Sequence, residues 1–278
     1  MAHAFPTHRR TLRFVAVVAL AGSLAAGAAP AFAQSTSTSD RATGERYWVE
    51  LVVGSWRPDL TGAVSSDQLG LIGSRIDFVS DLGFGAGRFT DVRLVLRPAK
   101  KHRFRFQYTP MEFAGDSILS RDIAFAGQVY PVALPVQSLL SWKVMRIGYE
   151  WDFFYRSRGF VGILLEARMT DLSASLDSIV GSGSIAGSAP LPAIGVVGRA
   201  YPLRNLALNV EVSGLTIGDV SPSHAFDTMD AELSATFNLT NNVGVTGGWR
   251  RMNTNIRFDT DRGELDFRGL WFGGAIRY

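Results

Sequence analysis

Serine, histidine and aspartate lie close together in one stretch of the chain. Residues 221–230 contain Ser221, Ser223, His224, Asp227 and Asp230. A histidine that takes a proton from a serine hydroxyl, with an acid to orient its ring, is the arrangement that hydrolyses esters and amides. Such a triad requires its members to converge in space, which residues so close in sequence rarely do. A solvated loop is the simpler interpretation, and an enzyme that uses His224 as a base remains an alternative.

Other motifs with chemical meaning are weak. Gly83, Gly85 and Gly87 are spaced G-x-G-x-G, without the spacing or the strand-then-helix context of a dinucleotide site, so we expect residues 81–88 to be a flexible part of a loop. His102 follows Lys101 at an expected turn and fits an interfacial side chain. The 278 residues include no cysteine, which excludes disulfides, thiol chemistry and cysteine-ligated metals. We therefore expect neither a cofactor nor a metal site.

The first 33 residues have the features of a secretory signal peptide. Arg9, Arg10 and Arg13 precede an apolar run, and residues 31–33 read Ala-Phe-Ala, as at a cleavage site. Residues 34–45 are rich in serine and threonine and are expected to form a flexible lead-in. Beyond residue 33 no apolar run approaches the ~20 residues of a spanning helix. Since the first 33 residues carry three arginines and no acid, the remainder has 25 basic and 25 acidic residues, a balance that argues against nucleic acid as a partner.

Alternation of apolar and polar residues predicts β-strands along the rest of the chain. In the last segment, Leu270, Phe272, Gly274, Ile276 and Tyr278 share one face. A strand that ends the chain needs a partner for its edge, and pairing with the first strand would close the sheet into a barrel. We predict about ten strands, with eight or twelve as alternatives, at residues 46–57, 89–97, 102–111, 139–154, 160–170, 191–201, 206–215, 228–239, 243–253 and 267–278.

Short and long connections alternate between these strands. The short ones, at residues 98–101, 155–159, 202–205 and 240–242, contain turn-forming residues. The long ones are expected at residues 58–88, 112–138, 171–190, 216–227 and 254–266. Transmembrane barrels have short periplasmic turns and longer extracellular loops. The pattern therefore predicts an all-β protein, a closed antiparallel transmembrane β-barrel over residues 46–278.

The two faces of the strands differ in polarity. In residues 139–154, Met145 and Ile147 share one face, while Arg146 and Glu150 lie on the other. In a membrane barrel the apolar face contacts lipid and the charged face lines the lumen. The candidates for the lumen are Arg46, Arg93, Arg103, Arg105, Arg146, Arg168, Arg199 and Arg250, with Glu50, Asp91, Glu150, Asp152, Glu166, Glu211, Asp230 and Glu232. Because long paired side chains fill so narrow an interior, we expect a plugged or very narrow lumen.

A soluble periplasmic β-protein is an alternative, since it would bury the apolar face and expose the charged one. Two features favour the membrane barrel. Several strands carry both signs of charge on the polar face, and aromatic residues gather at strand ends, where a membrane interface would lie. These residues are Tyr47, Trp151, Phe153, Phe237 and Tyr278.

The signal peptide, the alternating connections and the C-terminal strand ending on Tyr278 resemble the small outer-membrane β-barrel proteins of Gram-negative bacteria. The resemblance implies Sec-dependent export to the cell outer membrane, contact with membrane lipid and lipopolysaccharide, and recognition of the last strand by the barrel assembly machinery. It covers the architecture and says little about activity.

The expected function is therefore that of a non-enzymatic, porin-like envelope barrel. It would support envelope structure, surface interaction or the passage of a small solute. An envelope enzyme acting on lipid A or peptides at the extracellular rim is the alternative. The sequence leaves the oligomeric state and any ligand open.

Overall fold

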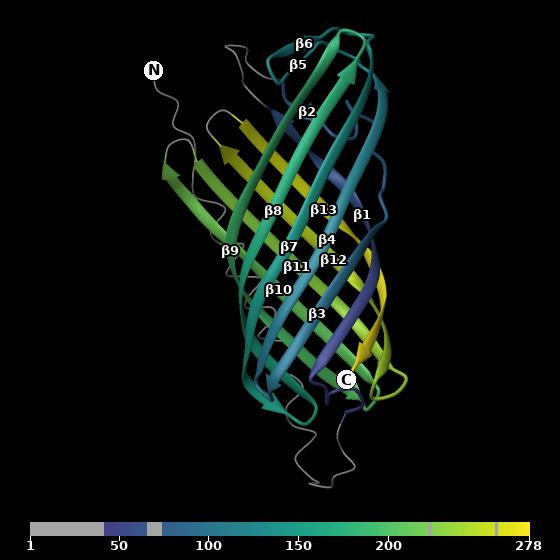
Figure 1. Cartoon of the computed structure of the whole chain (residues 1–278), viewed down its shortest axis with the longest axis vertical. Coiled ribbons are helices and arrows are strands. Elements are labelled where there is room, and N and C mark those ends of the chain that lie inside the picture. Colours follow the sequence, from purple (N-terminus) through teal and green to yellow (C-terminus); the bar gives the residue numbers. More distant parts are fainter. Residues whose placement is uncertain (1–41, 66–73, 222–223, 259–260) are drawn as a thin grey trace. The chain divides into compact units, whose positions relative to one another are not determined.

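The computed structural model of the chain describes residues 42–65, 74–221, 224–258 and 261–278, which are coloured in Figure 1. These residues form strands, turns and irregular segments. In this part of the chain no helix is long and apolar enough to cross a membrane.

Ten long strands form one closed antiparallel sheet, and each strand pairs with the next along the sheet (Figure 1). They are β1 (Val49–Ser65), β3 (Phe89–Ala99), β4 (His102–Ile118), β7 (Pro135–Arg156), β8 (Gly159–Ser178), β9 (Gly181–Leu203), β10 (Leu206–Ser221), β11 (His224–Asn238), β12 (Val243–Phe258) and β13 (Asp261–Arg277). The last strand closes the barrel on the first, in register from Glu50 opposite Arg277 to Ser65 opposite Arg262. The predicted all-β, closed antiparallel barrel of ten strands is confirmed.

The strands are longer than expected. β7 has 22 residues and β9 has 23, about twice the ~9–11 that a tilted membrane strand needs. Several expected long loops are therefore wrong: residues 171–190 belong to β8 and β9, which are joined by a turn at Ile179 and Val180, and most of 216–227 and 254–266 is also strand. Residues 112–138 are strand at both ends and contain the β5 (Ile123–Phe125) and β6 (Gln128–Tyr130) hairpin between them.

The alternation continues through these extensions, but the polarity of the two faces is exchanged. On β7, Arg146 and Glu150 point inward on the side of Ala42 and Tyr278, whereas Trp142 and Leu140 point inward farther from these two residues. On the outer face of β8, the exposed Ile163, Leu165 and Met169 are followed by Asp171, Ser173 and Asp177. We call the half nearest Ala42 and Tyr278 the lower half, and the other the upper half. The lower half is apolar outside and charged inside; the upper half is polar outside and apolar inside.

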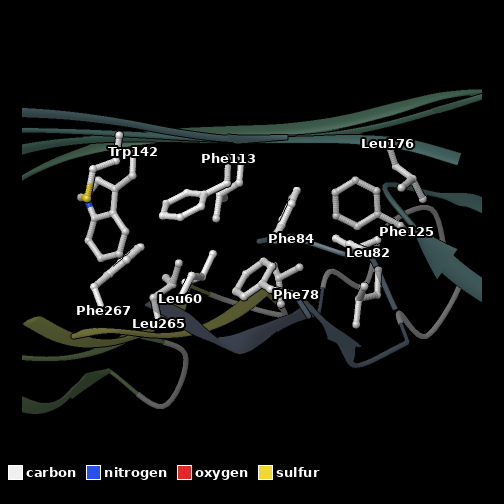
Figure 2. Close-up of a cluster of buried hydrophobic side chains, with 14 of the residues drawn as sticks. Leu60, Phe78, Leu82, Phe84, Phe113, Phe125, Trp142, Leu176, Leu265 and Phe267 are labelled. Carbon is white, nitrogen blue, oxygen red and sulfur yellow. The ribbon is translucent and has the colours of Figure 1, made fainter. Parts of the chain in front are cut away.

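The upper half has a hydrophobic core inside the barrel. Figure 2 shows aromatic and aliphatic side chains filling the space between two walls, among them Phe113, Trp142 and Phe267. The T-shaped contact of Trp142 with Phe267, with ring centroids 4.7 Å apart, joins β7 to β13 across the interior. Close packing of this kind leaves no room for water between the walls.

Part of this core comes from a segment that folds inward between β1 and β4. β2 (Ile76–Asp77) pairs with β1 at Val64 and Ala63, and Phe78, Leu82 and Phe84 follow it into the core. The side chains of Ser117 and Ser138 donate hydrogen bonds to the Asp81 and Leu82 carbonyls, at 2.7 and 3.3 Å. We call residues 76–84 the plug segment. Residues 81–84 are thus packed, and the expected flexible loop there is wrong.

A turn at the start of the plug segment is held by a carboxylate. Asp77 Oδ1 accepts hydrogen bonds from the backbone N–H groups of Val79 and Ser80, at 3.0 and 2.9 Å. Partial burial alone would raise the pKa of Asp77, but the donors of Ser80 and Val79 outweigh it, so the pKa lies below its ordinary value. The charged form of Asp77 therefore favours the turn.

The wall of the upper half is incomplete in two places. β3 pairs with β1 only up to Trp56 and with β4 only up to Tyr108, and the plug segment occupies the gap. β10 pairs with β9 up to Ile194, so among the described residues 181–193 of β9 have β8 as their single neighbouring strand. Proline has no N–H for a neighbouring strand and is found at such edges. Each gap begins two residues from a proline, namely Pro58, Pro110 and Pro192.

Candidate functional site

The lower half of the barrel encloses a network of charged side chains. Nine arginines and nine carboxylates from all ten long strands and the residues before β1 point inward, so these charges sum to zero. They are Arg93, Arg97, Arg103, Arg105, Arg146, Arg168, Arg199, Arg250 and Arg277, with Glu45, Glu50, Asp91, Glu150, Asp152, Glu166, Glu211, Asp230 and Glu232. Alternation along each strand places them, because every second residue faces the lumen.

Arg146 lies at the centre of the network. Its Nη1 donates to Gln107 Oε1 and Asp230 Oδ2, both at 3.1 Å. Its Nη2 donates to Glu166 at 2.8 Å and to Glu211 at 3.2 Å. One guanidinium thus ties β7 to β4, β8, β10 and β11. A planar, permanently charged donor with five N–H groups suits such a role, whereas lysine would supply one point charge.

Paired contacts around this centre cross the lumen in several directions. Arg93 binds both oxygens of Glu232, at 2.8 Å each, which joins β3 to β11. Arg105 donates to Glu150 at 3.1 Å and to Glu211 at 2.5 Å. Because β3 and β11 are far apart in the sheet order, these bonds pass through the space where a channel would run.

The lower end is closed by residues that precede β1. Glu45 is buried and accepts hydrogen bonds from Tyr201 at 2.6 Å and Tyr155 at 3.1 Å. Arg97 Nη2 lies 3.3 Å from Glu45 Oε1. The Thr43 N–H donates to the Arg204 carbonyl at 2.7 Å. Residues 42–45, which precede the first predicted strand, therefore pack at the lower end of the barrel.

A layer of tryptophans separates the charged interior from the apolar core above. Trp56 and Trp271 are both buried. Arg250 lies 4.9 Å from the Trp56 ring centroid, and Arg93 lies 4.3 Å from that of Trp271. Each ring thus presents one face to a guanidinium, a favourable contact for a desolvated cation.

A cavity of about 110 Å³ remains among the charged side chains, lined by residues that include Tyr47, Arg103 and Arg199. Some ion pairs made by the lining arginines are long: Arg103 Nη2 is 3.6 Å from Glu45 Oε1, and Arg199 Nη2 is 4.0 Å from Glu50 Oε1. Water can bridge charges at such spacings, and the volume suits a few water molecules.

The structure places fifteen of the sixteen candidate lumen residues on the inner face, and Arg46 is the exception. Arg46 precedes β1, where the chain is irregular, and its side chain is exposed. Its neighbours Glu45 and Tyr47 point inward instead. The strand predicted to begin at residue 46 begins at Val49, so strand alternation does not apply to Arg46.

Sequence reasoning also missed Glu45, Arg97 and Arg277. Arg277 donates to Glu50 and to Asn238, the latter at 2.8 Å. Both arginines have the same parity as the inward residues of their own strands, and that signal could have identified them. Glu45 had no such signal, because it lies outside any strand.

Of the residues considered for catalysis, Ser223 and the side chains of Ser221 and His224 lie outside the part of the chain that the structure describes. His102 lies on the outer face near the lower end, where its Nδ1 is 2.6 Å from the Tyr149 hydroxyl. Among the side chains that the structure describes, no cluster of three or more His, Asp or Glu residues is arranged to hold a metal ion.

Exposed apolar side chains cover the outside of the lower half. They include Leu51, Val53, Phe104, Phe106, Ile147, Leu165, Leu208, Leu233 and Phe272. At the end of the barrel where Ala42 and Tyr278 lie, the exposed apolar residues include the aromatic Trp48, Trp151, Phe153, Phe237 and Tyr278. An apolar band with aromatic residues at its edge is the surface that a transmembrane barrel presents to a bilayer.

No protein-family model matches the chain, and no curated protein matches it in sequence. Solved structures do match it in fold. The outer membrane protease OmpT from Escherichia coli is 12% identical, with a TM-score of 0.51 over 82% of this chain and 97% of OmpT. Ail, the attachment invasion locus protein of Yersinia pestis, is 11% identical with a TM-score of 0.35, over 82% of this chain and 97% of Ail. Neisserial surface protein A is 14% identical with a TM-score of 0.31, over 83% and 97%.

The fold and the outer surface define a class. The chain has the fold of an outer-membrane β-barrel, as in OmpT, and its outer surface is the one that such a barrel presents to lipid. At 12% identity the likeness to OmpT concerns the fold alone.

Proposed function

We propose that the protein is a non-enzymatic, non-conducting outer-membrane barrel whose upper half is a rigid scaffold that presents a surface outside the cell. The interior is obstructed at two levels, by the arginine–carboxylate network and by the apolar core with its plug segment. The second obstruction carries the proposal, because a core that excludes water has no path for a hydrated ion or solute.

The proposal includes how the protein reaches the membrane. Residues 1–33 would direct Sec-dependent export, and the C-terminal strand would be recognised by the barrel assembly machinery. The exposed Leu270, Phe272 and Ile276 on the outer face of β13, and the exposed Tyr278 directly after it, support this recognition. With the chain ends on the periplasmic side, as in other barrels, the upper half extends away from the cell.

Single-channel recording in a planar bilayer tests this function. We expect no steady openings from refolded, heat-modifiable protein. A variant that lacks residues 76–84 and carries Arg146→Ala loses part of both obstructions and is expected to conduct, which shows that the assay detects an open lumen. Steady, ion-selective openings from the intact protein would overturn the proposal in favour of solute passage.

A further inference from the structure

The tips of β4, β7 and β8 form a surface with an ordered pattern of side chains. On the outer face, Asp116 lies opposite Gln137, and Gln137 lies opposite Asp177. In the next row toward the tip, Ile118 lies opposite Pro135, and Ile179 begins the β8–β9 turn directly after Asp177 and Ser178. An acidic row thus runs beside an apolar row across three strands.

These side chains are unusually exposed. Ile179 is 92% exposed and Ile118 is 70% exposed. They border a surface hollow of about 630 Å³ that Asp116, Gln137 and Asp177 also line. Packing does not account for these isoleucines, because their side chains are exposed. Contact with lipid does not account for them either. The outer face of β8 is already polar at Asp171, about 20 Å along the strand before Asp177, so the isoleucines lie well outside the apolar band.

No residue in the described part of the chain neutralises the charges of this surface. Neither Asp116 nor Asp177 forms an ion pair with another described residue, and the residues that line the hollow include no lysine or arginine. Cross-strand neighbours are about 5 Å apart, so the two carboxylates lie about 10 Å from one another. Exposed apolar side chains beside unpaired charges of one sign are typical of an interaction surface.

We propose that this surface binds a protein segment that carries apolar side chains between two basic residues. The isoleucines and Pro135 would receive the apolar side chains, and Asp116 and Asp177 would each pair with a lysine or arginine. In a polyproline II segment, basic residues three positions apart lie on the same side about 9 Å apart, which matches the spacing of the carboxylates. The proposal depends on the proposed function, since it places the upper half outside the cell.

A labelled peptide with the sequence Lys-Ile-Leu-Lys, flanked by glycines, is the probe. Its fluorescence anisotropy is measured with the protein in phosphatidylcholine nanodiscs and with empty nanodiscs. We expect binding to the protein only, and loss of binding when both lysines of the peptide are glutamate. Asp116→Asn and Asp177→Asn should each weaken binding about two- to fivefold, as loss of an exposed ion pair does. Ile179→Ser should weaken it as well.

Asp59→Asn is the matched control, because Asp59 is an exposed carboxylate on the outer face of β1, away from the hollow. It should leave binding unchanged. Absence of binding above that of empty nanodiscs, or equal binding to the three carboxylate variants, would overturn the proposal.

Failure of the proposed function is distinguished by a second measurement. Because the chain has no cysteine, Ser173→Cys supplies a single thiol on the outer face of the upper half. It should react with an impermeant maleimide on intact cells. If Ser173→Cys remains unlabelled while the nanodiscs still bind the peptide, the surface is a binding site but its placement outside the cell is wrong.

Discussion

At the scale of single residues, the lumen shows why arginine recurs on the inner face. Arg250 donates to both oxygens of Asp230, at 3.1 and 2.6 Å, and packs against Trp56. The pair is buried, so each charge depends on the other for the solvation that water would otherwise give. The main effect of these ion pairs is to offset the desolvation penalty of the buried charges, and they add little net stability.

This dependence gives a testable prediction. Arg250→Met should lower the free energy of unfolding by about 3 kcal/mol, because it leaves Asp230 short of a partner in a buried site. The double variant Arg250→Met with Asp230→Leu should cost less than the sum of the two single changes. Urea unfolding followed by the heat-modifiable gel band measures all three. Additive costs would show that the two residues do not act as a pair.

At the scale of elements, the plug segment depends on a close approach to β4. A Cβ atom at Gly115 would lie 2.2 Å from the Leu82 carbonyl oxygen and 3.0 Å from Phe84 Cδ1. Glycine is therefore required where the plug segment crosses the strand.

Gly115→Ala should displace the plug segment and destabilise the upper half by about 1–3 kcal/mol, as overpacking does. Trypsin should then cut faster at Arg75 and Arg88, which flank the segment. Gly85→Ala is the control, since a Cβ atom at Gly85 meets nothing within 4 Å. If both variants are cut at the same rate, the contact with Gly115 does not hold the segment in place.

The elements also show what the sequence could reveal. The lower half was predictable because its alternation places charge opposite apolar residues, as with Arg146 and Ile147. In the upper half, Asp171, Ser173 and Asp177 resemble a loop by composition, although they keep the period of a strand. The same serines and aspartates suit the outer face of a strand in water, so composition alone does not separate the two structures.

The plug segment was beyond such reasoning. Phe78, Leu82 and Phe84 lie in a glycine-containing stretch without alternation, and their burial depends on contacts with Phe113 and Leu140, which are distant in the sequence. The points at which strand pairing stops were also difficult to predict. Each of these points lies two residues from a proline, namely Pro58 in β1, Pro110 in β4 and Pro192 in β9. Prolines within otherwise regular strands were the available signal.

At the scale of the whole molecule, the outer face of β8 crosses from lipid to water. Ile163→Arg should cost about 2–4 kcal/mol if its site is near the membrane midplane, because a charge there faces hydrocarbon. Ser173→Arg, on the same face of the same strand but in the upper half, should be close to neutral. Unfolding from lipid vesicles measures both variants. If both variants lower the free energy of unfolding equally, the boundary between lipid and water does not lie between Ile163 and Ser173.

The exchange of polarity between the two halves fixes the depth of the protein in the membrane from both directions. Movement outward would expose residues such as Met145 and Leu165 to water, and movement inward would draw Asp171 and Lys143 into hydrocarbon. A barrel with a uniform outer face can shift along the membrane normal at little cost when bilayer thickness changes. In this barrel, a shift in either direction carries a free-energy cost. In a thinner or thicker membrane the lipid would therefore deform around the protein, and the height of the upper half above the surface would stay constant.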